Sequence, residues 1–337
     1  MTVRWGILSA SAIGRVVVPA AAGAPDAEIV AVAARDGVRA KAYAAELGIP
    51  LSFGSYDELL DSDEIDAVYV PLPISMHTDW TVRALEAGKH VLCEKPFAMT
   101  AADAARCFEA AERAGKVCIE GLMYRHHPQT SLARRLVAEG AIGRLAEIRA
   151  VLSVSVEPDD IRRTPALGGG AVYDLGCYCV SAIRLFGGEP SQVYAVQAQD
   201  GPDGEDLRTA AVLTLPDGVL GHFDVGLDLP RRDELEIIGT GGKITIPDPW
   251  LCRPGHIELE RDGVTERLPV DPTGEWGLVG TAADSYRIEL GVAAAVIAGA
   301  EREFGREDAI AQARVLESLR RSAKTGRPVP TARVMEP

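Results

Sequence analysis

Short apolar runs and amphipathic stretches alternate through the first 120 residues, and this alternation limits the possible folds more than any other feature of the chain. The apolar runs, each of strand length, are residues 3–8, 27–35, 65–73, 90–96 and 117–124. Helical patterns lie between them at residues 13–22, 36–48, 76–89 and 100–116. Strands joined through helices pair in parallel, so this half predicts a doubly wound parallel sheet with helices on both faces.

A different pattern begins near residue 145, where turn residues separate one apolar strand pattern from the next. Helical patterns interrupt this second half at residues 127–140, 171–187, 280–300 and 306–324. Successive strands without crossover helices indicate an α+β domain with a large, open, mostly antiparallel sheet. We therefore expect two domains, an α/β domain of residues 1–122 and an α+β domain of residues 123–337. The C-terminal helices are expected to pack back toward the first domain.

Composition and charge disfavour several classes of function. Of the 337 residues, 47% are hydrophobic, which is enough for a full core, and the net charge of −14 disfavours binding to nucleic acid or anionic membranes. No apolar run approaches the roughly 18 residues of a membrane span, and the N-terminus is unlike a secretory leader. The six cysteines form no C-x-x-C pair, so we expect buried thiols, no bound metal and a cytoplasmic location.

The segment WGILSASAIGR, residues 5–15, lies where a dinucleotide-binding fold places its phosphate turn. That turn normally reads G-x-G-x-x-G, and because only Gly14 remains here, the segment also fits a plain strand-to-helix connection. Serine and alanine are small enough to let a phosphate approach the backbone, and the amides of a helix N-terminus attract that phosphate. Gly14 can let the helix pack closely on the sheet. The predicted cofactor-binding turn comprises Ser9, Ala10, Ser11, Ala12, Ile13, Gly14 and Arg15.

The end of the second strand indicates which dinucleotide is bound. An acidic residue at this position hydrogen-bonds the ribose 2′-hydroxyl of NAD, whereas here Ala34 is followed by Arg35 and Asp36. The Arg35 guanidinium matches a 2′-phosphate in charge and in geometry, which favours NADP. The alternative is a solvated surface arginine with Asp36 or Arg39 as its neighbour.

Four further stretches point to a family. HVLCEKPFAMT contains the Glu-Lys-Pro element, YVPLPISMHTDW forms the third-strand turn, GLMYRHHPQ begins the second domain, and ALGGGAVYDLGCYCVSAIRLFGG is a glycine-led helix. Together they resemble the Gfo/Idh/MocA oxidoreductases. The serine-containing turn is similar to that of the branch with NADP-dependent xylose 1-dehydrogenases and dihydrodiol dehydrogenases. The further cofactor-binding residues expected on this basis are Pro71, Leu72, Pro73, His77, Glu94, Lys95 and Arg162.

The resemblance also directs attention to residues able to carry acid–base chemistry. Oxidation of an alcohol gives a hydride to the nicotinamide and a proton to a base. Tyr178 is the candidate base, and the Lys95 ammonium can lower the phenol pKa from about 10 or take the proton itself. Asp174, four residues before Tyr178 and one helical turn away, can bind a substrate hydroxyl or orient Lys95. Gly168–Gly170 can let the backbone approach the ligands.

Each of these assignments has a structural alternative. Tyr178 could be a buried core tyrosine, Lys95 a surface lysine and Asp174 a helix cap. His126 and His127 look like a metal-binding pair, but nothing completes the ligand set, which favours packing or substrate contact. Further candidates for the pocket are Arg125, Arg163 and Tyr286.

The sequence therefore predicts an NADP-dependent oxidoreductase acting on a hydroxyl or carbonyl carbon of a sugar or related polyol, as an aldose 1-dehydrogenase does. Oxidation of a trans-dihydrodiol and reduction of a 3-keto-deoxysugar need the same chemistry and remain open, as does a cofactor-binding regulator without turnover. The expected partners are a small-molecule substrate and a second copy of the chain, in a homodimer or homotetramer that covers the open sheet.

Overall fold

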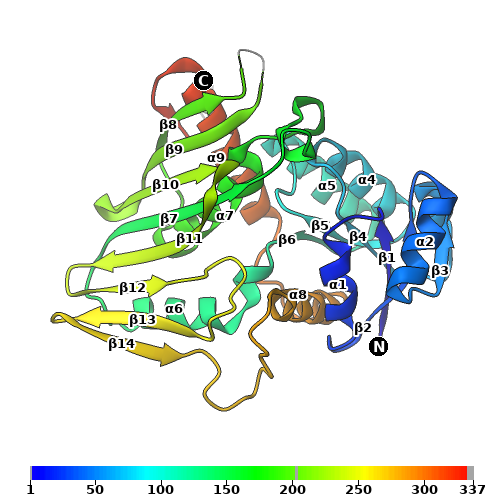
Figure 1. Cartoon of the computed structure of the whole chain (residues 1–337), viewed down its shortest axis with the longest axis horizontal. Coiled ribbons are helices and arrows are strands. Elements are labelled where there is room, and N and C mark those ends of the chain that lie inside the picture. The colour runs from blue at the N-terminus through cyan, green and yellow to red at the C-terminus, as the bar shows by residue number, and fades with distance from the viewer. Residues whose placement is uncertain (1, 202–203, 332–337) are drawn as a thin grey trace. The chain divides into compact units, whose positions relative to one another are not determined.

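The computed structural model describes residues 2–201 and 204–331, and Figure 1 follows the chain from blue at the N-terminus to red at the C-terminus. Contacts divide the chain into two compact units. The first takes in the chain up to Ala98, Ala102–His127 and Thr281–Ile310. The second takes in Met99–Ala101, Pro128–Gly280 and the chain from Ala311 onward.

The first unit holds a six-stranded sheet in the order β3-β2-β1-β4-β5-β6, parallel at every junction. Its strands are β1 (Val3–Leu8), β2 (Ala27–Ala33), β3 (Leu51–Phe53), β4 (Ala67–Val70), β5 (His90–Glu94) and β6 (Cys118–Gly121). The helices in this part of the chain are α1 (Gly14–Ala21), α2 (Gly37–Leu47), α3 (Tyr56–Leu60), α4 (Ile74–Glu86), α5 (Ala101–Ala114) and α8 (Ala282–Ile297). The predicted parallel sheet of the α/β half is confirmed.

β3 and α3 were not predicted from the sequence pattern. β3 has three residues at the sheet edge, none of them fully buried, so it is too short to produce an alternating pattern. α3 has five residues, and its local signal is Ser55, whose side chain accepts a hydrogen bond from the Glu58 amide at 3.2 Å.

Strand β1 lies at the point of the sheet where the strand order reverses. It pairs with β2 on one side and with β4 on the other, and its Trp5 and Ile7 side chains are fully buried. The loops after β1 and β4 therefore leave the sheet at neighbouring carboxyl ends. In open parallel sheets this switch point is where a ligand crevice forms.

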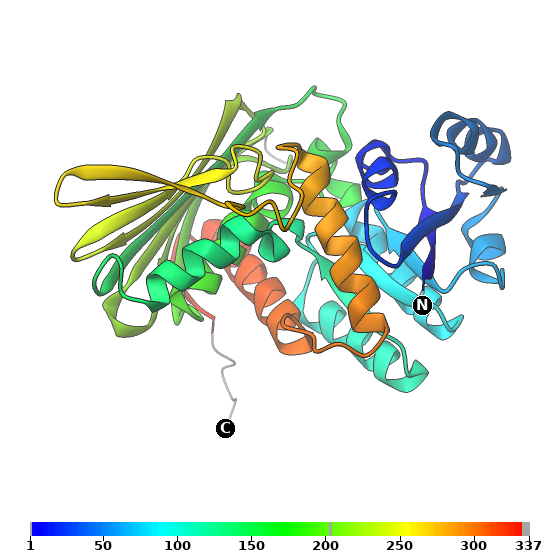
Figure 2. The same cartoon turned by 90° about the horizontal axis from the view of Figure 1, so that it is seen from below.

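Helix α8 follows the second sheet in sequence but belongs to the first unit. It packs against α1, and Figure 2 shows the two helices side by side. A capping box opens it, in which the Thr281 amide donates to the Asp284 carboxylate at 3.2 Å. The last part of the chain, from Ala311 onward, belongs to the second unit instead.

The second unit is built on a nine-stranded sheet in the order β14-β13-β12-β11-β7-β10-β9-β8-β15. Only β7 and β10 pair in parallel among these described strands, so the sheet is mostly antiparallel, as predicted. Its strands are β7 (Leu145–Ser155), β8 (Gln192–Gln199), β9 (Asp206–Thr214), β10 (Leu220–Gly226), β11 (Asp228–Gly239), β12 (Gly242–Ile246), β13 (His256–Arg261), β14 (Val264–Pro269) and β15 (Val329–Pro330).

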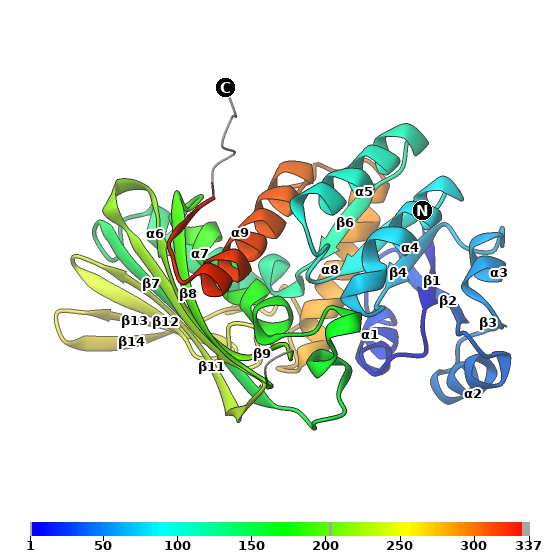
Figure 3. The same ribbon diagram turned by 90° about the horizontal axis from the view of Figure 1, so that it is seen from above.

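Helices cover one face of this sheet. They are α6 (Pro128–Ala138), α7 (Cys177–Gly187) and α9 (Arg306–Thr325), and Figure 3 shows them along the same side. Along β8, β9 and β10, buried side chains alternate with more exposed ones, and the exposed ones lie on the other face of the sheet. Apolar members of this exposed set are Tyr194, Val196, Val212 and Leu220.

One segment passes a length and hydropathy test for a membrane span. An 18-residue window within Pro165–Gly187 has a mean hydropathy of 1.2, which corrects the expectation that no stretch would qualify. In the structure 83% of its apolar window is buried inside the protein, as in the core helix of a globular fold. The segment begins with a short turn, continues as a π-helix at Val172–Gly176 and ends as α7.

Candidate functional site

The turn after β1 has the backbone of a glycine turn although it lacks the glycines. Ser9 has φ of +126°, a region that L residues rarely adopt, and its amide donates to the Ala33 carbonyl at 3.0 Å. Such a conformation costs on the order of 1–3 kcal/mol and persists where function or surrounding structure demands it. Ser9 thus takes the shape required of the first glycine in a phosphate-binding turn.

Gly14 has a different role from the one expected. The Tyr43 hydroxyl, on α2, donates to the Ser11 carbonyl at 2.8 Å, and a β-carbon on Gly14 would collide with that hydroxyl. Gly14 therefore allows α2 to approach the turn, rather than allowing α1 to approach the sheet. The Ser11 hydroxyl also accepts from the Gly14 amide, at 3.4 Å.

Arg15 is held by α2. Its guanidinium makes a double contact with the Glu46 carboxylate, at 2.7 and 2.9 Å, and lies 5.1 Å from the centre of the Tyr43 ring. The pair is about half exposed, so it adds little to stability. These contacts leave a cofactor role for Arg15 as a prediction.

Positive charge gathers where β2 ends. Arg35 is exposed and makes no ion pair within residues 2–201 and 204–331. The Asp36 carboxylate caps α2 by accepting from the Val38 amide at 2.8 Å. Arg39, which sequence analysis assigned no role, donates to the Ala10 carbonyl at 3.0 Å and so reaches the phosphate turn. Two arginines and an already engaged carboxylate suit a ribose 2′-phosphate better than a free 2′-hydroxyl.

His77 joins the loops that follow β4 and β5. Its ring is fully buried, with Nδ1 2.9 Å from the Pro96 carbonyl oxygen and Nε2 2.8 Å from the Leu72 carbonyl oxygen. Burial lowers the ring's pKa, so the neutral form donates from one nitrogen at a time. Both nitrogens face backbone oxygens, so the ring positions the Pro71–Pro73 loop.

The Glu-Lys-Pro element lies where β5 ends. Glu94 is buried, and its carboxylate accepts from the Tyr69 hydroxyl at 2.5 Å and from the Lys95 amide at 3.2 Å. Burial and the neighbouring Glu94 and Glu120 raise the pKa of Glu289 on α8 well above its usual value. The Lys95 side chain is partly exposed, whereas the Glu94 carboxylate points into the core.

In the second unit, Arg162 lies between two carboxylates. It donates to Asp160 at 2.8 and 2.7 Å, and its Nη1 lies 3.9 Å from the Asp174 Oδ2. The structure thus brings Arg162 and Asp174 together, although the sequence placed them in different roles. The Asp174 side chain is 15% exposed, which leaves room for a ligand hydroxyl to reach it.

Asp174 stands in a π-helical segment, Val172–Gly176, instead of the α-helix expected there, and Tyr178 lies in the first turn of α7. A wide turn of this kind is rare and is found mostly at functional sites. Gly170, two residues before this segment, has a φ of +112°, which suits glycine.

The glycines before this segment accommodate the protein's own groups. A β-carbon on Gly169 would collide with the Arg162 carbonyl, and one on Gly170 would collide with the Asp206 carboxylate. This differs from the expectation that the glycines make room for substrate and nicotinamide. These two glycines are needed because the segment packs closely against Arg162 and β9.

Asp206 anchors the start of the π-helical segment from β9. Its Oδ2 accepts from the Val172 amide at 2.8 Å and from the Thr209 hydroxyl at 2.7 Å. Burial raises the pKa of this carboxyl to about 6. Nothing in the sequence pairs residues 172 and 206, and sequence analysis missed this contact.

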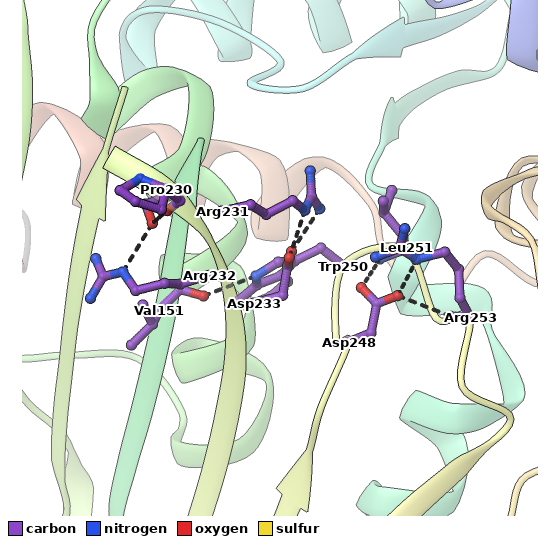
Figure 4. Close-up of polar contacts among 10 residues, drawn as sticks. Val151, Pro230, Arg231, Arg232, Asp233, Asp248, Trp250, Leu251 and Arg253 are labelled. Carbon is purple, nitrogen blue, oxygen red and sulfur yellow. Dashed lines mark hydrogen bonds and ion pairs between the residues drawn. The ribbon is translucent and has the colours of Figure 1, made fainter. Parts of the chain in front are cut away.

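Trp250 supports the Tyr178 ring, which is itself 7% exposed. The two ring centres lie 5.7 Å apart. The indole N–H donates to the Val151 carbonyl at 3.2 Å, and Figure 4 shows this hydrogen bond. Asp248 fixes the turn that carries Trp250 by accepting from Arg253 Nε at 2.5 Å. The Tyr178 ring therefore packs against Trp250, a contact that no sequence pattern indicated.

The remaining candidates have structural partners. Arg125 is buried against Asp308 at 2.5 Å, and Arg163 pairs with Asp200. Tyr286 is buried within α8. Burial lowers the pKa of His126 and of His127 to about 4, as expected of packed, neutral rings. Across the described part of the chain, no three His, Cys, Asp or Glu side chains gather in a way that could hold a metal ion.

Comparison with known families agrees with this geometry. A model described as "Oxidoreductase family, NAD-binding Rossmann fold" matches residues 3–122, and one described as "GFO/IDH/MocA C-terminal domain" matches residues 130–245. The chain belongs to the GFO/IDH/MocA family. The resemblance seen in the Glu-Lys-Pro element and the glycine-led helix is confirmed.

Members of the GFO/IDH/MocA family similar to this chain act on several substrates. The D-xylose 1-dehydrogenase (NADP(+)) 2 of Haloferax volcanii is 37% identical and covers 96% of this chain and 98% of its own. The trans-1,2-dihydrobenzene-1,2-diol dehydrogenase of Bos taurus is 31% identical over 81% of both chains. A solved 3-ketoreductase from Actinomadura kijaniata, in complex with NADP and TDP-benzene, superposes with a TM-score of 0.86 at 29% identity, covering 96% and 98%.

The buried Asp206 carboxyl gives the fold a defined pH dependence. Its folded pKa of about 6 exceeds an unfolded value of about 3.9, so the folded chain holds an extra proton between these values. The resulting stabilisation is full below the unfolded pKa and is lost as pH rises through about 6. In Asp206→Asn, which keeps an oxygen acceptor, the difference between the free energies of unfolding at pH 5 and pH 8 should change by about 1 kcal/mol.

Urea unfolding of the whole chain at the two pH values measures this effect. Glu266→Gln, which changes an exposed carboxyl on β14, is the matched control and should leave the pH difference as in the parent. An Asp206→Asn variant with the parent's pH difference would show that the carboxyl titrates normally.

Proposed function

We propose that this chain is an NADP-dependent oxidoreductase that transfers a hydride between the nicotinamide and a hydroxyl or carbonyl carbon of a sugar or related polyol. The observation that carries the proposal is the charge around the opening turn. Ser9 gives that turn a glycine-like backbone, Arg39 is bonded to it, and Arg35 stands free of ion pairs in the described chain. The Asp36 carboxylate, which could otherwise accept a hydrogen bond from a ribose 2′-hydroxyl, caps α2 instead.

The residues proposed to hold the cofactor follow the carboxyl ends of β1, β2, β4 and β5. The amides of the Ser9–Gly14 turn would bind the pyrophosphate and Arg35 the 2′-phosphate, while the Pro71–Pro73 loop and the Glu94-Lys95 end of β5 would line the nicotinamide half. Arg162 is a further proposed cofactor contact. When bound, NADP supplies or accepts the hydride.

The chain's own residues would move the proton. In oxidation, the Tyr178 phenolate takes the proton of the substrate hydroxyl, and in reduction the phenol returns it. The Lys95 ammonium favours the phenolate, because a nearby cation lowers the phenol pKa. The Asp174 carboxylate accepts a hydrogen bond from a neighbouring substrate hydroxyl, and the adjacent Arg162 guanidinium orients it. This mechanism requires the Lys95 ammonium and the Tyr178 phenol to reach the same substrate hydroxyl.

Similarity supports a sugar-type substrate and leaves its identity to experiment. The D-xylose 1-dehydrogenase of Haloferax volcanii is similar over almost the whole chain, which favours oxidation at C1 of an aldose. The likeness to the ketoreductase from Actinomadura kijaniata supports reduction of a keto-deoxysugar as the second candidate. Oxidation of a trans-dihydrodiol is a third, from the bovine relative.

The cofactor assignment predicts a preference that depends on Arg35. Binding titrations should show NADPH bound more tightly than NADH, and Arg35→Ala should reduce this preference by about tenfold or more, the scale of a charge-assisted hydrogen bond. Lys41→Ala, which removes an exposed cation elsewhere on α2, is the matched control and should keep it. Equal affinities for the two cofactors in the parent would contradict the assignment.

The catalytic assignment predicts separate effects at Lys95 and Tyr178. With a panel of aldoses, diols and keto-sugars followed at 340 nm, Lys95→Ala should lower turnover by about a hundredfold or more, the scale of lost acid–base catalysis. Tyr178→Phe should abolish the rise in oxidation rate on the alkaline side. Parent-like turnover in Lys95→Ala, or an unchanged pH profile in Tyr178→Phe, would refute the respective role. A parent that binds NADPH but turns over no substrate in the panel would indicate a regulator.

We further infer that two copies pair through the open face of the large sheet, in the cytoplasm. Val212 and its apolar neighbours on β8–β10 are exposed there, whereas the six cysteines are buried and free, as in a reducing compartment. Sedimentation at micromolar concentration should show a dimer or tetramer that Val212→Asp dissociates. Val264→Asp, on the edge strand β14, is the control. A monomeric parent would refute the pairing.

A further inference from the structure

A cavity of about 640 Å³ opens beside α9 within the second unit. Its walls come from α9, from β8, from the residue before Asp174 and from residues 99–100. The volume lies within the range of small-molecule pockets. None of the residues to which the proposed reaction assigns a role lines it, so the cavity needs an explanation of its own.

Three cations of α9 line this cavity. Arg320 lies 4.7 Å from the centre of the Tyr173 ring and pairs with Glu205 at 3.1 Å. Arg321 and Lys324 are exposed and make no ion pair in the part of the chain that the structure describes. Like charges three and four residues apart on a helix repel each other, and the two carboxylates nearby, Glu205 and Glu317, offset this repulsion only in part.

A buried amide donor completes the lining. The Gln197 side chain on β8 has its Nε2 buried without a hydrogen-bond partner in the described structure, although the cavity lies beside it. A buried donor without an acceptor is costly, and turning the Gln197 amide toward the cavity would let a bound oxygen satisfy it. The cavity's carboxylate, on Glu317, accepts from the Ala101 amide at 3.3 Å and is thereby partly engaged.

We propose that this cavity binds a small phosphorylated polyol, with the phosphate held by Arg321 and Lys324 and hydroxyls bonded to Gln197 and Glu317. A guanidinium binds two phosphate oxygens at once, and the ammonium adds a second charge. The carboxylate accepts from a sugar hydroxyl but would repel a second phosphate, which selects a ligand with one charged end. Bound there, the ligand touches Tyr173, the residue that precedes Asp174.

The test uses glucose 6-phosphate and isothermal titration of the protein saturated with NADPH, so that the 2′-phosphate site is filled and the sugar is not oxidised. The parent should bind one equivalent, and added salt should weaken binding because ion contacts are screened. The double variant Arg321→Gln/Lys324→Gln should bind glucose 6-phosphate at least about tenfold more weakly than the parent. Arg327→Gln, an exposed cation just beyond α9, is the control and should keep the parent's affinity.

The outcomes separate this site from the proposed reaction. Binding that persists in the double variant would lie elsewhere, for instance where the substrate binds, and would overturn the proposal, as would the absence of binding to the parent. The double variant should also melt at or above the parent's temperature without ligand, because it removes a repulsion. A lower melting temperature would show that the two cations serve the fold instead.

Discussion

Parallel pairing is the constraint on which the proposed cofactor site depends. Because β1, β2, β4 and β5 run in one direction, their carboxyl ends meet along one edge of the first sheet. Ser9, Arg35, the Pro71–Pro73 loop and Lys95 each follow one of those ends. Local contacts then refine the edge, as where His77 ties the loop after β4 to the residue after Lys95. The glycines of the usual motif can be absent because this geometry comes from the sheet.

Most of the fold could be predicted from the sequence, because a long helix or strand has a hydrophobic period that is visible within its own segment. The alternation of the first half and the run of strands in the second predicted both sheets, and the Glu-Lys-Pro element identified the family. β3 and α3 escaped because three and five residues are too few for a period. The π-helical segment escaped because its register depends on the Asp206 carboxylate, which comes from a distant strand.

The site was predictable as a set of residue types and less so as a set of contacts. The sequence pattern assigned Arg15 to the cofactor turn and gave Arg39 no role, yet Arg15 contacts Glu46 on α2 and Arg39 donates to the Ala10 carbonyl of the turn. Trp250 reaches Tyr178 across a separation of 72 residues, 250 − 178, and only tertiary packing makes that contact. Local patterns identify the residues able to do chemistry, and packing decides which of them are free to do it.

The burial of every cysteine has a practical consequence. A thiolate is the reactive form of cysteine, and burial raises the pKa of Cys93, Cys118 and Cys179 well above its usual value. The folded chain therefore presents no ready nucleophile to maleimides or to disulfide exchange. A single cysteine introduced at an exposed position of α9 would therefore take up a thiol-reactive spectroscopic label, while the six native cysteines stay unlabelled.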